Sequence, residues 1–180
     1  MKDYSKLIET DRLILRKFKL SDYKDVFTEY ASHDIVTKFL TWKPHKSMED
    51  TIEYLQKCVL PKYEESYVYR WAIVLKETNM VIGCIDVVKM DLSSSMCEIG
   101  CVIGEKYWGK GIMTEAGKIV LDYLLKEGFK RIQSYAHVDN IASSKMLQKV
   151  GLKIEGILSK FAKDRDGKLV DVIMHSYEVQ

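Results

Sequence analysis

The stretch from Tyr107 to Ala116 carries a lysine bracketed by two glycines directly into the start of an apolar-periodic helix. Gly109 and Gly111 allow the backbone to turn sharply and to come close to a ligand. The first N–H groups of a helix have no partner within it, and with the positive end of the helix dipole they favour an anion. The stretch therefore predicts a cradle for a phosphorylated ligand.

The surroundings of this loop predict an alternation of strands and helices. Residues 96–103 alternate as a strand before the loop, and residues 130–138 form another strand after its helix. Asn140 is expected to cap a second, short helix that ends at Gly151. The cradle is therefore predicted at a strand-to-helix junction.

Two known nucleotide-binding motifs do not fit the loop. A Walker motif requires a hydroxyl directly after the lysine, but Lys110 is followed by Gly111 and the first hydroxyl is that of Thr114. A Rossmann fingerprint requires a third glycine or an alanine at the position of Thr114. The phosphorylated ligand is therefore not expected to bind through either motif.

Length and charge limit the remaining possibilities. With 180 residues, of which 47% are hydrophobic, residues 1–180 are expected to form a single domain with one core. The net charge of +2, from 28 basic and 26 acidic residues, is too balanced for a nucleic-acid-binding surface. No apolar run is long enough for a membrane span or a targeting core, so we expect no membrane partner and a cytoplasmic location.

The cysteines form no Cys-x-x-Cys pair, so neither a metal site nor a disulfide is expected. Each one lies in a strand or helix pattern that predicts a buried, small hydrophobic residue. They are Cys58, Cys84, Cys97 and Cys101.

Turn and cap signals outline the rest of the fold. Ser21-Asp22 and Ser47 are predicted to cap two helices, the second with Asp50 reaching back to its cap. Hairpins are expected around Glu77-Thr78-Asn79 and around Asp164-Arg165-Asp166-Gly167, and Gly128 is expected to end the helix after the cradle in a left-handed conformation. These elements predict an α/β fold with a mixed, mostly antiparallel sheet flanked by helices.

The order of these pieces resembles the GCN5-related N-acetyltransferase (GNAT) superfamily, and specifically its branch of ribosomal-protein alanine N-acetyltransferases. The resemblance spans nearly the whole chain. It rests on Glu9-Thr10-Asp11-Arg12-Leu13-Ile14-Leu15-Arg16, Arg70-Trp71-Ala72-Ile73-Val74, Val81-Ile82-Gly83-Cys84-Ile85, Glu98-Ile99-Gly100, Trp108-Gly109-Lys110-Gly111, Thr114-Glu115-Ala116, Asn140-Ile141-Ala142-Ser143, Lys149-Val150-Gly151-Leu152 and Glu155-Gly156.

This resemblance implies a central sheet that splays open around acetyl-coenzyme A (acetyl-CoA) as cosubstrate. Val102 and Ile103 would offer backbone groups to the pantetheine arm, which Asn140 would also bind. The backbone N–H groups that would take the pyrophosphate are those of Gly109, Lys110, Gly111, Met113 and Thr114. The chain departs from the usual motif at Trp108, where Gln or Arg is common, and at Met113, where Gly or Ala is common.

An amine must lose a proton before it attacks a thioester, and the departing thiolate must be stabilised or protonated. Many members of the superfamily use a tyrosine for the thiolate, but Leu147 stands at that position here. The resemblance makes Ser143 the alternative donor, with Asn140 beside it, although Ser143 also fits a purely structural place in the first helical turn. Glu98 is the candidate base for the amine and His137 its rival, while a structural role is open for both.

The resemblance thus implies an N-acetyltransferase that works by direct attack in a ternary complex, because no cysteine is placed as a nucleophile. A peptide N-terminus is the first acceptor considered, and amino acids, polyamines or an amine antibiotic are also open. The alternative from another class is a noncatalytic acyl-CoA sensor. A monomer and a homodimer are both compatible with the sequence.

Overall fold

The computed structural model describes residues 3–179. Its strands form one sheet of eight in the order β1-β2-β3-β4-β5-β6-β8-β7. The pairs β1–β2, β2–β3, β3–β4, β6–β8 and β7–β8 are antiparallel, and β5–β6 is parallel. The predicted mixed, mostly antiparallel sheet is therefore confirmed. The strands are β1 (Ile8–Glu9), β2 (Leu13–Arg16), β3 (Arg70–Leu75), β4 (Met80–Asp91), β5 (Met96–Ile103), β6 (Arg131–His137), β7 (Lys153–Lys163) and β8 (Leu169–Glu178).

The chain divides into two compact units that alternate along the sequence. The first unit comprises the residues up to Thr37 together with Pro44–Asp86 and Cys101–Ile112. The second unit comprises Lys38–Lys43, Val87–Gly100 and the residues from Met113 onward. Strands β4 and β5 contribute residues to both units.

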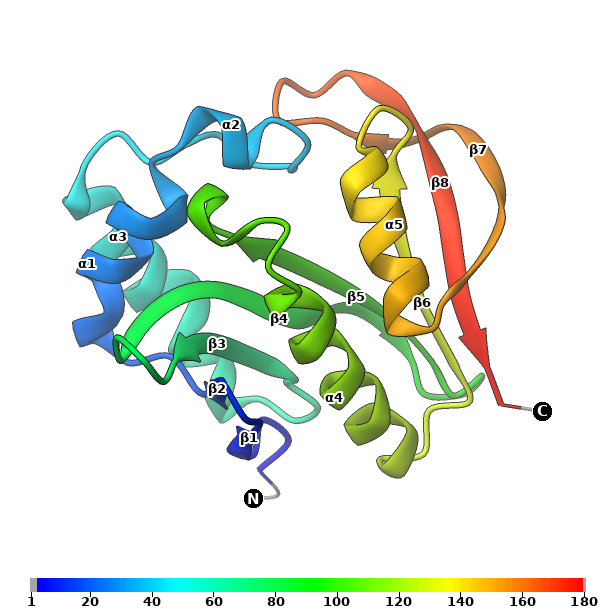
Figure 1. Ribbon diagram of the computed structural model, residues 1–180, viewed down its shortest axis with the longest axis horizontal. Coiled ribbons are helices and arrows are strands. Elements are labelled where there is room, and N and C mark those ends of the chain that lie inside the picture. The colour runs from blue at the N-terminus through cyan, green and yellow to red at the C-terminus, as the bar shows by residue number, and fades with distance from the viewer. Residues whose placement is uncertain (1–2, 180) are drawn as a thin grey trace. The chain divides into compact units, whose positions relative to one another are not determined.

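Helices α1 (Tyr23–Val26) and α3 (Met48–Tyr54) lie side by side in the first unit (Figure 1). Each continues into a π-helical turn, η2 (Phe27–Ala31) after α1 and η3 (Leu55–Val59) after α3. Such turns often occur at functional sites. The shorter helical segments of this unit are η1 (Leu20–Asp22), α2 (Asp34–Thr37), η4 (Pro61–Glu64) and η5 (Glu105–Tyr107).

One of the two predicted caps in this unit is confirmed and the other is wrong. The Ser47 hydroxyl accepts the N–H of Asp50 at 3.3 Å, and the Asp50 carboxylate accepts the N–H of Ser47 at 3.2 Å. Asp22, in contrast, makes no side-chain cap for α1. Its carboxylate instead accepts two hydrogen bonds from the Arg16 guanidinium and one from the N–H of Lys19.

The second unit contains α4 (Ile112–Lys126), apart from its first residue, and α5 (Ile141–Val150). Helix α5 packs on β6 and β8, as Figure 1 shows. The two helices pack closely, since a Cβ added to Gly117 would lie 2.6 Å from the Val150 Cγ2 atom. Gly128 follows α4 with φ of 103°, which confirms the predicted left-handed end.

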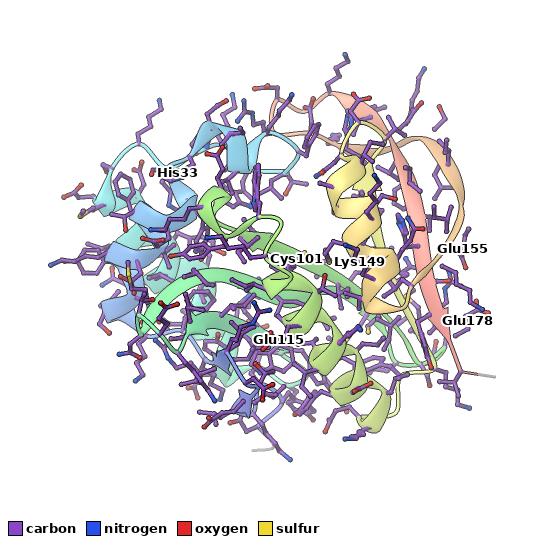
Figure 2. The ribbon with its side chains drawn as sticks, viewed as in Figure 1. His33, Cys101, Glu115, Lys149, Glu155 and Glu178 are labelled. Atoms are coloured by element: carbon purple, nitrogen blue, oxygen red, sulfur yellow. The ribbon has the colours of Figure 1, made fainter. Side chains whose placement is uncertain are left out.

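Both predicted hairpins are present, because β3 pairs with β4 and β7 pairs with β8. The β7–β8 ladder shifts register twice, between Ile154 and Gly156 and between Leu158 and Ala162. Arg131 of β6 ties this hairpin to the sheet, since its guanidinium pairs with Glu155 of β7 and Glu178 of β8. Figure 2 shows these two glutamates close to one another.

The parallel ladder between β5 and β6 is short. It runs from the pair Met96–Arg131 to the pair Glu98–Gln133, and beyond it the Ser134 hydroxyl donates to the Ile99 carbonyl at 2.8 Å. The short ladder agrees with the open sheet that the sequence led us to expect.

The cysteines are free thiols, and one expectation about their burial is wrong. Cys97 is buried and Cys84 and Cys101 are partly buried, but Cys58 is exposed because it lies on the solvent side of the π-helical turn η3. Among the described residues, no helix combines the length and the apolar character that a membrane crossing requires.

Candidate active site

The glycine loop of the first unit has the backbone conformation that its sequence predicts. Gly109 and Gly111 adopt φ of 72° and 74°, in the left-handed region that favours glycine. A Cβ added to Gly109 would have no heavy atom within 4 Å, and one added to Gly111 would meet only the Arg12 guanidinium, at 3.7 Å. The space over the loop is therefore open to a ligand.

The loop amides are available to such a ligand. Within residues 3–179, no backbone carbonyl accepts a loop hydrogen bond from the N–H of Gly109, Lys110 or Gly111. Helix α4 starts directly afterwards at Ile112, so the unpaired N–H groups of its first turn follow in the same chain segment. In this first turn the Met113 side chain is buried, so only its backbone is offered to a ligand. The Thr114 side chain is half-buried.

Two side chains that the sequence analysis did not identify hold the loop segment in the first unit. Arg12 donates to the Lys110 carbonyl at 3.0 Å. Glu29 accepts the Tyr107 hydroxyl and the Lys106 ammonium, each at 2.6 Å. These partners are far apart in sequence, so no local pattern could have indicated them.

The end of β5 is also fixed from within the first unit. The Trp108 indole N–H donates to the Ile103 carbonyl at 2.9 Å, and the Val102 carbonyl lies so close to Gly83 that an added Cβ would be 2.4 Å from its oxygen. Trp108, the departure from the usual motif, thus has a structural partner. One lone pair of the Ile103 carbonyl is already used before any ligand binds.

Asn140 and Ser143 are brought together at the start of α5 in the second unit. The Asn140 side-chain oxygen accepts the N–H of Ser143 at 3.2 Å, which confirms the predicted cap. The Ser143 side chain is half-buried, and its hydroxyl makes no hydrogen bond to another residue in the described part of the chain. The hydroxyl is therefore free to serve a ligand.

The next residue, Ser144, has a different environment. Its hydroxyl is buried and lies 2.9 Å from Nε2 of His175, a fully buried histidine whose Nδ1 faces the Ile173 carbonyl at 3.1 Å. Burial lowers the pKa of His175. The neutral tautomer that satisfies both contacts donates from Nδ1 and accepts the Ser144 hydroxyl at Nε2.

Glu98 is buried, with 7% of its surface exposed, in the part of β5 that belongs to the second unit. Gln133 of β6 donates its side-chain amide to Glu98 Oε2 at 2.9 Å, a partner that the sequence analysis missed. Tyr135 lies on the same face of β6 as Gln133, and its ring packs edge-on against that of Phe161, with ring centroids 5.5 Å apart. Burial, with a further contribution from Glu98, raises the pKa of Tyr135.

Glu98 and Ser143 are not on the same side of the sheet. His175 and its ladder partner Ser134 face α5, because His175 contacts Ser144. Side chains alternate along a strand, so Gln133 and its partner Glu98 face the opposite side. The candidate base and the helix that carries Ser143 thus occupy opposite faces.

His137, the rival base, is engaged in local contacts. Its Nδ1 accepts the N–H of Asp139 at 3.1 Å, and its ring packs against Phe39 with centroids 5.0 Å apart. Leu147, at the position of the absent tyrosine, is buried in the face of α5 that packs on the sheet. His137 thus has a structural role through Nδ1 and its ring, and the apolar Leu147 cannot donate a proton as the tyrosine of other members does.

The thiols of Cys84, Cys97 and Cys101 are not prepared for nucleophilic attack. Burial raises the pKa of Cys97 and of Cys101 to about 12, and it raises the pKa of Cys84 well above its ordinary range. The nucleophile is the thiolate, which these values suppress near neutral pH. Figure 2 shows the position of Cys101.

An acyl carrier with a diphosphate fits the residues present. Open space over two left-handed glycines and loop amides without backbone partners are the features that a diphosphate requires. Described by itself, the second unit also presents polar groups to a ligand, namely the half-buried Ser143 hydroxyl and the capped start of α5.

Comparison with known proteins identifies the family. The family described as Acetyltransferase (GNAT) domain matches residues 12–153. The protein named "Uncharacterized N-acetyltransferase p20" of Bacillus licheniformis is 33% identical over 168 residues, covering 93% of this chain and 93% of its own length.

Solved structures agree with this match. A GNAT-family acetyltransferase from Bacillus anthracis superposes with a TM-score of 0.81 at 27% identity, covering 96% of this chain and 98% of its own. RimL, a ribosomal L7/L12 alpha-N-protein acetyltransferase solved with coenzyme A, superposes with a TM-score of 0.83 at 20% identity. The superposition covers 97% of this chain and 98% of the RimL chain. The second likeness shows the fold alone. The chain belongs to the GNAT family of acetyltransferases and is an N-acetyltransferase that uses acetyl-CoA, as the sequence predicted.

Proposed function

We propose that residues 1–180 act as one domain that transfers an acetyl group to a primary amine, by direct attack in a ternary complex. The single observation that carries this proposal is the loop with two left-handed glycines, open space above it and amides without backbone partners. This loop accounts for binding of the donor through its diphosphate, and family membership accounts for the reaction. Suppressed thiolates at Cys84, Cys97 and Cys101 favour direct transfer over an acyl-cysteine intermediate.

Acetyl-CoA supplies the acetyl group as a reactive thioester. The proposed residues for the diphosphate are Gly109, Lys110, Gly111, Met113 and Thr114, all through backbone N–H groups. Val102 and Ile103 would contact the pantetheine arm, with the Ile103 carbonyl limited to its second lone pair by Trp108. Asn140 and Ser143 would contact it from the start of α5.

Glu98 is proposed to accept the proton that the acceptor amine must lose. Gln133 occupies one of its carboxylate oxygens, which leaves the other for an amine or for an intervening water. The burial of Glu98 strengthens its attraction for a positively charged amine, because charge interactions are less screened away from water. The adjacent ring of Tyr135 would give the acceptor an apolar and aromatic surface.

Ser143 is proposed to donate a hydrogen bond to the sulfur that leaves, with Asn140 fixing the turn that presents it. Because Glu98 and α5 lie on opposite faces of the sheet, the Glu98 carboxylate and the Ser143 hydroxyl do not form a hydrogen bond with each other. Both groups would have to reach the same thioester, because the attacking nitrogen and the departing sulfur are bonded to one carbonyl carbon in the transition state.

A peptide N-terminus is the proposed acceptor, supported by the fold-level likeness to RimL. Amino acids, polyamines and amine antibiotics remain the alternatives within the same chemistry. Family membership favours turnover over a noncatalytic acyl-CoA sensor.

The test is release of coenzyme A thiol with a panel of acceptors. The panel contains peptides with a free N-terminus, the same peptides with a blocked N-terminus, single amino acids, a polyamine and an aminoglycoside. Turnover with free but not blocked peptides is expected. Faster turnover with a small amine would overturn the peptide assignment, and binding of coenzyme A with no turnover on any acceptor would favour the sensor.

A further inference from the structure

We propose that Arg12 and Glu29 are positioning residues that fix the diphosphate-binding loop from outside its motif. The inference rests on the proposed function, since it assigns a role in binding acetyl-CoA. Both residues belong to the first unit, as does the loop segment that they contact.

Glu29 fixes the segment that leads into the loop. It lies in the π-helical turn η2 with only 4% of its surface exposed, and it accepts from the Tyr107 hydroxyl and the Lys106 ammonium at 2.6 Å each. A buried carboxylate without partners would be strongly unfavourable, so these two charge-assisted contacts stabilise Glu29 at this position. Burial and then the hydrogen bond to Glu29 raise the pKa of Tyr107, and the hydrogen bond to Glu29 raises the pKa of Lys106.

The backbone of Glu29 contributes as well. Its carbonyl oxygen would be 2.3 Å from a Cβ added to Gly104, so the turn that leaves β5 lies directly against η2. Gly104 has φ of −57°, a conformation that any residue can adopt. The glycine is therefore required by close approach to Glu29 rather than by backbone conformation.

Arg12 fixes the loop itself. Its guanidinium Nη1 donates to the Lys110 carbonyl at 3.0 Å, across 98 positions in the sequence. In a trans peptide the C=O of one residue and the N–H of the next point in opposite directions, and no cis peptide bond occurs in the described chain. Holding the Lys110 carbonyl toward Arg12 therefore turns the Gly111 N–H away from Arg12, as a donor for the diphosphate.

Together these contacts make the loop rigid before a ligand arrives. Two left-handed glycines would otherwise give the loop many conformations, whose loss on binding weakens affinity. Removal of either contact should weaken binding of ligands that carry a diphosphate. A donor that lacks the diphosphate should not be affected, and this difference separates positioning from general destabilisation.

The experiment compares acetyl-CoA with S-acetylpantetheine, which lacks the diphosphate and the nucleotide. The variants are Arg12→Lys, which keeps the charge but loses the planar fork, Glu29→Gln, and Tyr107→Phe, which removes only the hydroxyl. Glu53→Gln is the matched control, because it removes an exposed ion pair with Lys57 elsewhere in the same unit. Calorimetry gives Kd for coenzyme A, and initial rates give kcat/KM for both donors.

We expect Kd for coenzyme A to rise by about tenfold to 100-fold in Arg12→Lys and Glu29→Gln, with a similar fall of kcat/KM for acetyl-CoA. Their kcat/KM for S-acetylpantetheine should equal that of the wild type. Equal losses with both donors, or no loss with either, would overturn the positioning role. If Glu29→Gln does not fold, Tyr107→Phe decides the role of that contact. Failure of the wild type to bind coenzyme A would instead overturn the proposed function.

Discussion

Gln133 donates its side-chain amide to Glu98 at 2.9 Å, while its own side-chain oxygen accepts from Arg131 Nε at 3.2 Å. The second contact determines which way the amide of Gln133 points, because a guanidinium can only donate. Gln133 must therefore present N–H to the carboxylate, and this fixes Glu98 in position. Arg131 is held in turn by Glu155 and Glu178.

Replacement of Glu98 by Gln should lower turnover by about 100-fold to 10,000-fold, the usual contribution of a general base. The loss should be largest at low pH, where most of the acceptor amine is protonated and depends on the base. The measurement is kcat/KM for the acceptor against pH, relative to the wild type. A ratio that does not change with pH would exclude Glu98 as the base.

Replacement of the adjacent serines of α5 by alanine should affect different properties, turnover for Ser143 and stability for Ser144. Ser143→Ala should lower turnover with little change in coenzyme A affinity or stability, because its hydroxyl has no partner among the described residues. Ser144→Ala should lower the free energy of unfolding by about 1–3 kcal/mol, because Nε2 of His175 loses its buried partner. Rates and denaturant melts on both variants provide the comparison. Unchanged turnover in Ser143→Ala would reject its role as a donor.

Glu155 should stabilise the protein in a pH-dependent manner. Hydrogen bonds from Arg131 and Ser176 lower the pKa of Glu155 from 4.5 to about 2. A pKa lowered by folding contributes stability above the unfolded pKa, and this contribution is lost as pH falls from about 4.5 towards 2. Glu155→Gln should therefore be less stable near neutral pH, by about 1 kcal/mol or less since the side chain is 37% exposed.

The difference between Glu155→Gln and the wild type should shrink through this acidic range. Denaturant melts at several pH values measure it, with Glu178→Gln as the control, because Glu178 is the more exposed partner of Arg131. A difference that stays constant between pH 7 and pH 3 would contradict the assignment of the low pKa to this ion pair.

Two glycine substitutions should distinguish an effect on the loop from an effect on overall stability. Gly104→Ala would place a Cβ against the Glu29 carbonyl. It should therefore lower the free energy of unfolding by about 1–3 kcal/mol and also weaken coenzyme A binding. Gly128→Ala meets no atom within 4 Å, and its φ of 103° should cost stability alone, by about 1 kcal/mol. Melting curves measure the stability of both variants, and calorimetry measures their affinity for coenzyme A. If Gly104→Ala binds coenzyme A as tightly as Gly128→Ala does, Gly104 is not coupled to the loop.

Features that depend on neighbours in sequence were predicted correctly from the sequence. The Gly109–Gly111 loop, the Ser47 and Asn140 caps and the left-handed Gly128 require particular backbone angles or hydrogen bonds within a few residues. Their chemistry is contained in the local sequence. The prediction for Asp22 failed because the helical segment begins earlier, at Leu20, so that Asp22 is its third residue, where its carboxylate accepts the N–H of Lys19 and pairs with Arg16.

The sequence by itself determined where the loop proposed to bind the diphosphate begins, which helices follow it and which family the chain resembles. Only the tertiary structure decided that Arg12 meets Lys110, that Glu29 meets Tyr107 and that Gln133 meets Glu98. These partners are separated by 98, 78 and 35 positions, and their contacts depend on how whole strands and helices pack. Packing also placed Glu98 and α5 on opposite faces of the sheet, because strand register fixes the direction of every side chain along it.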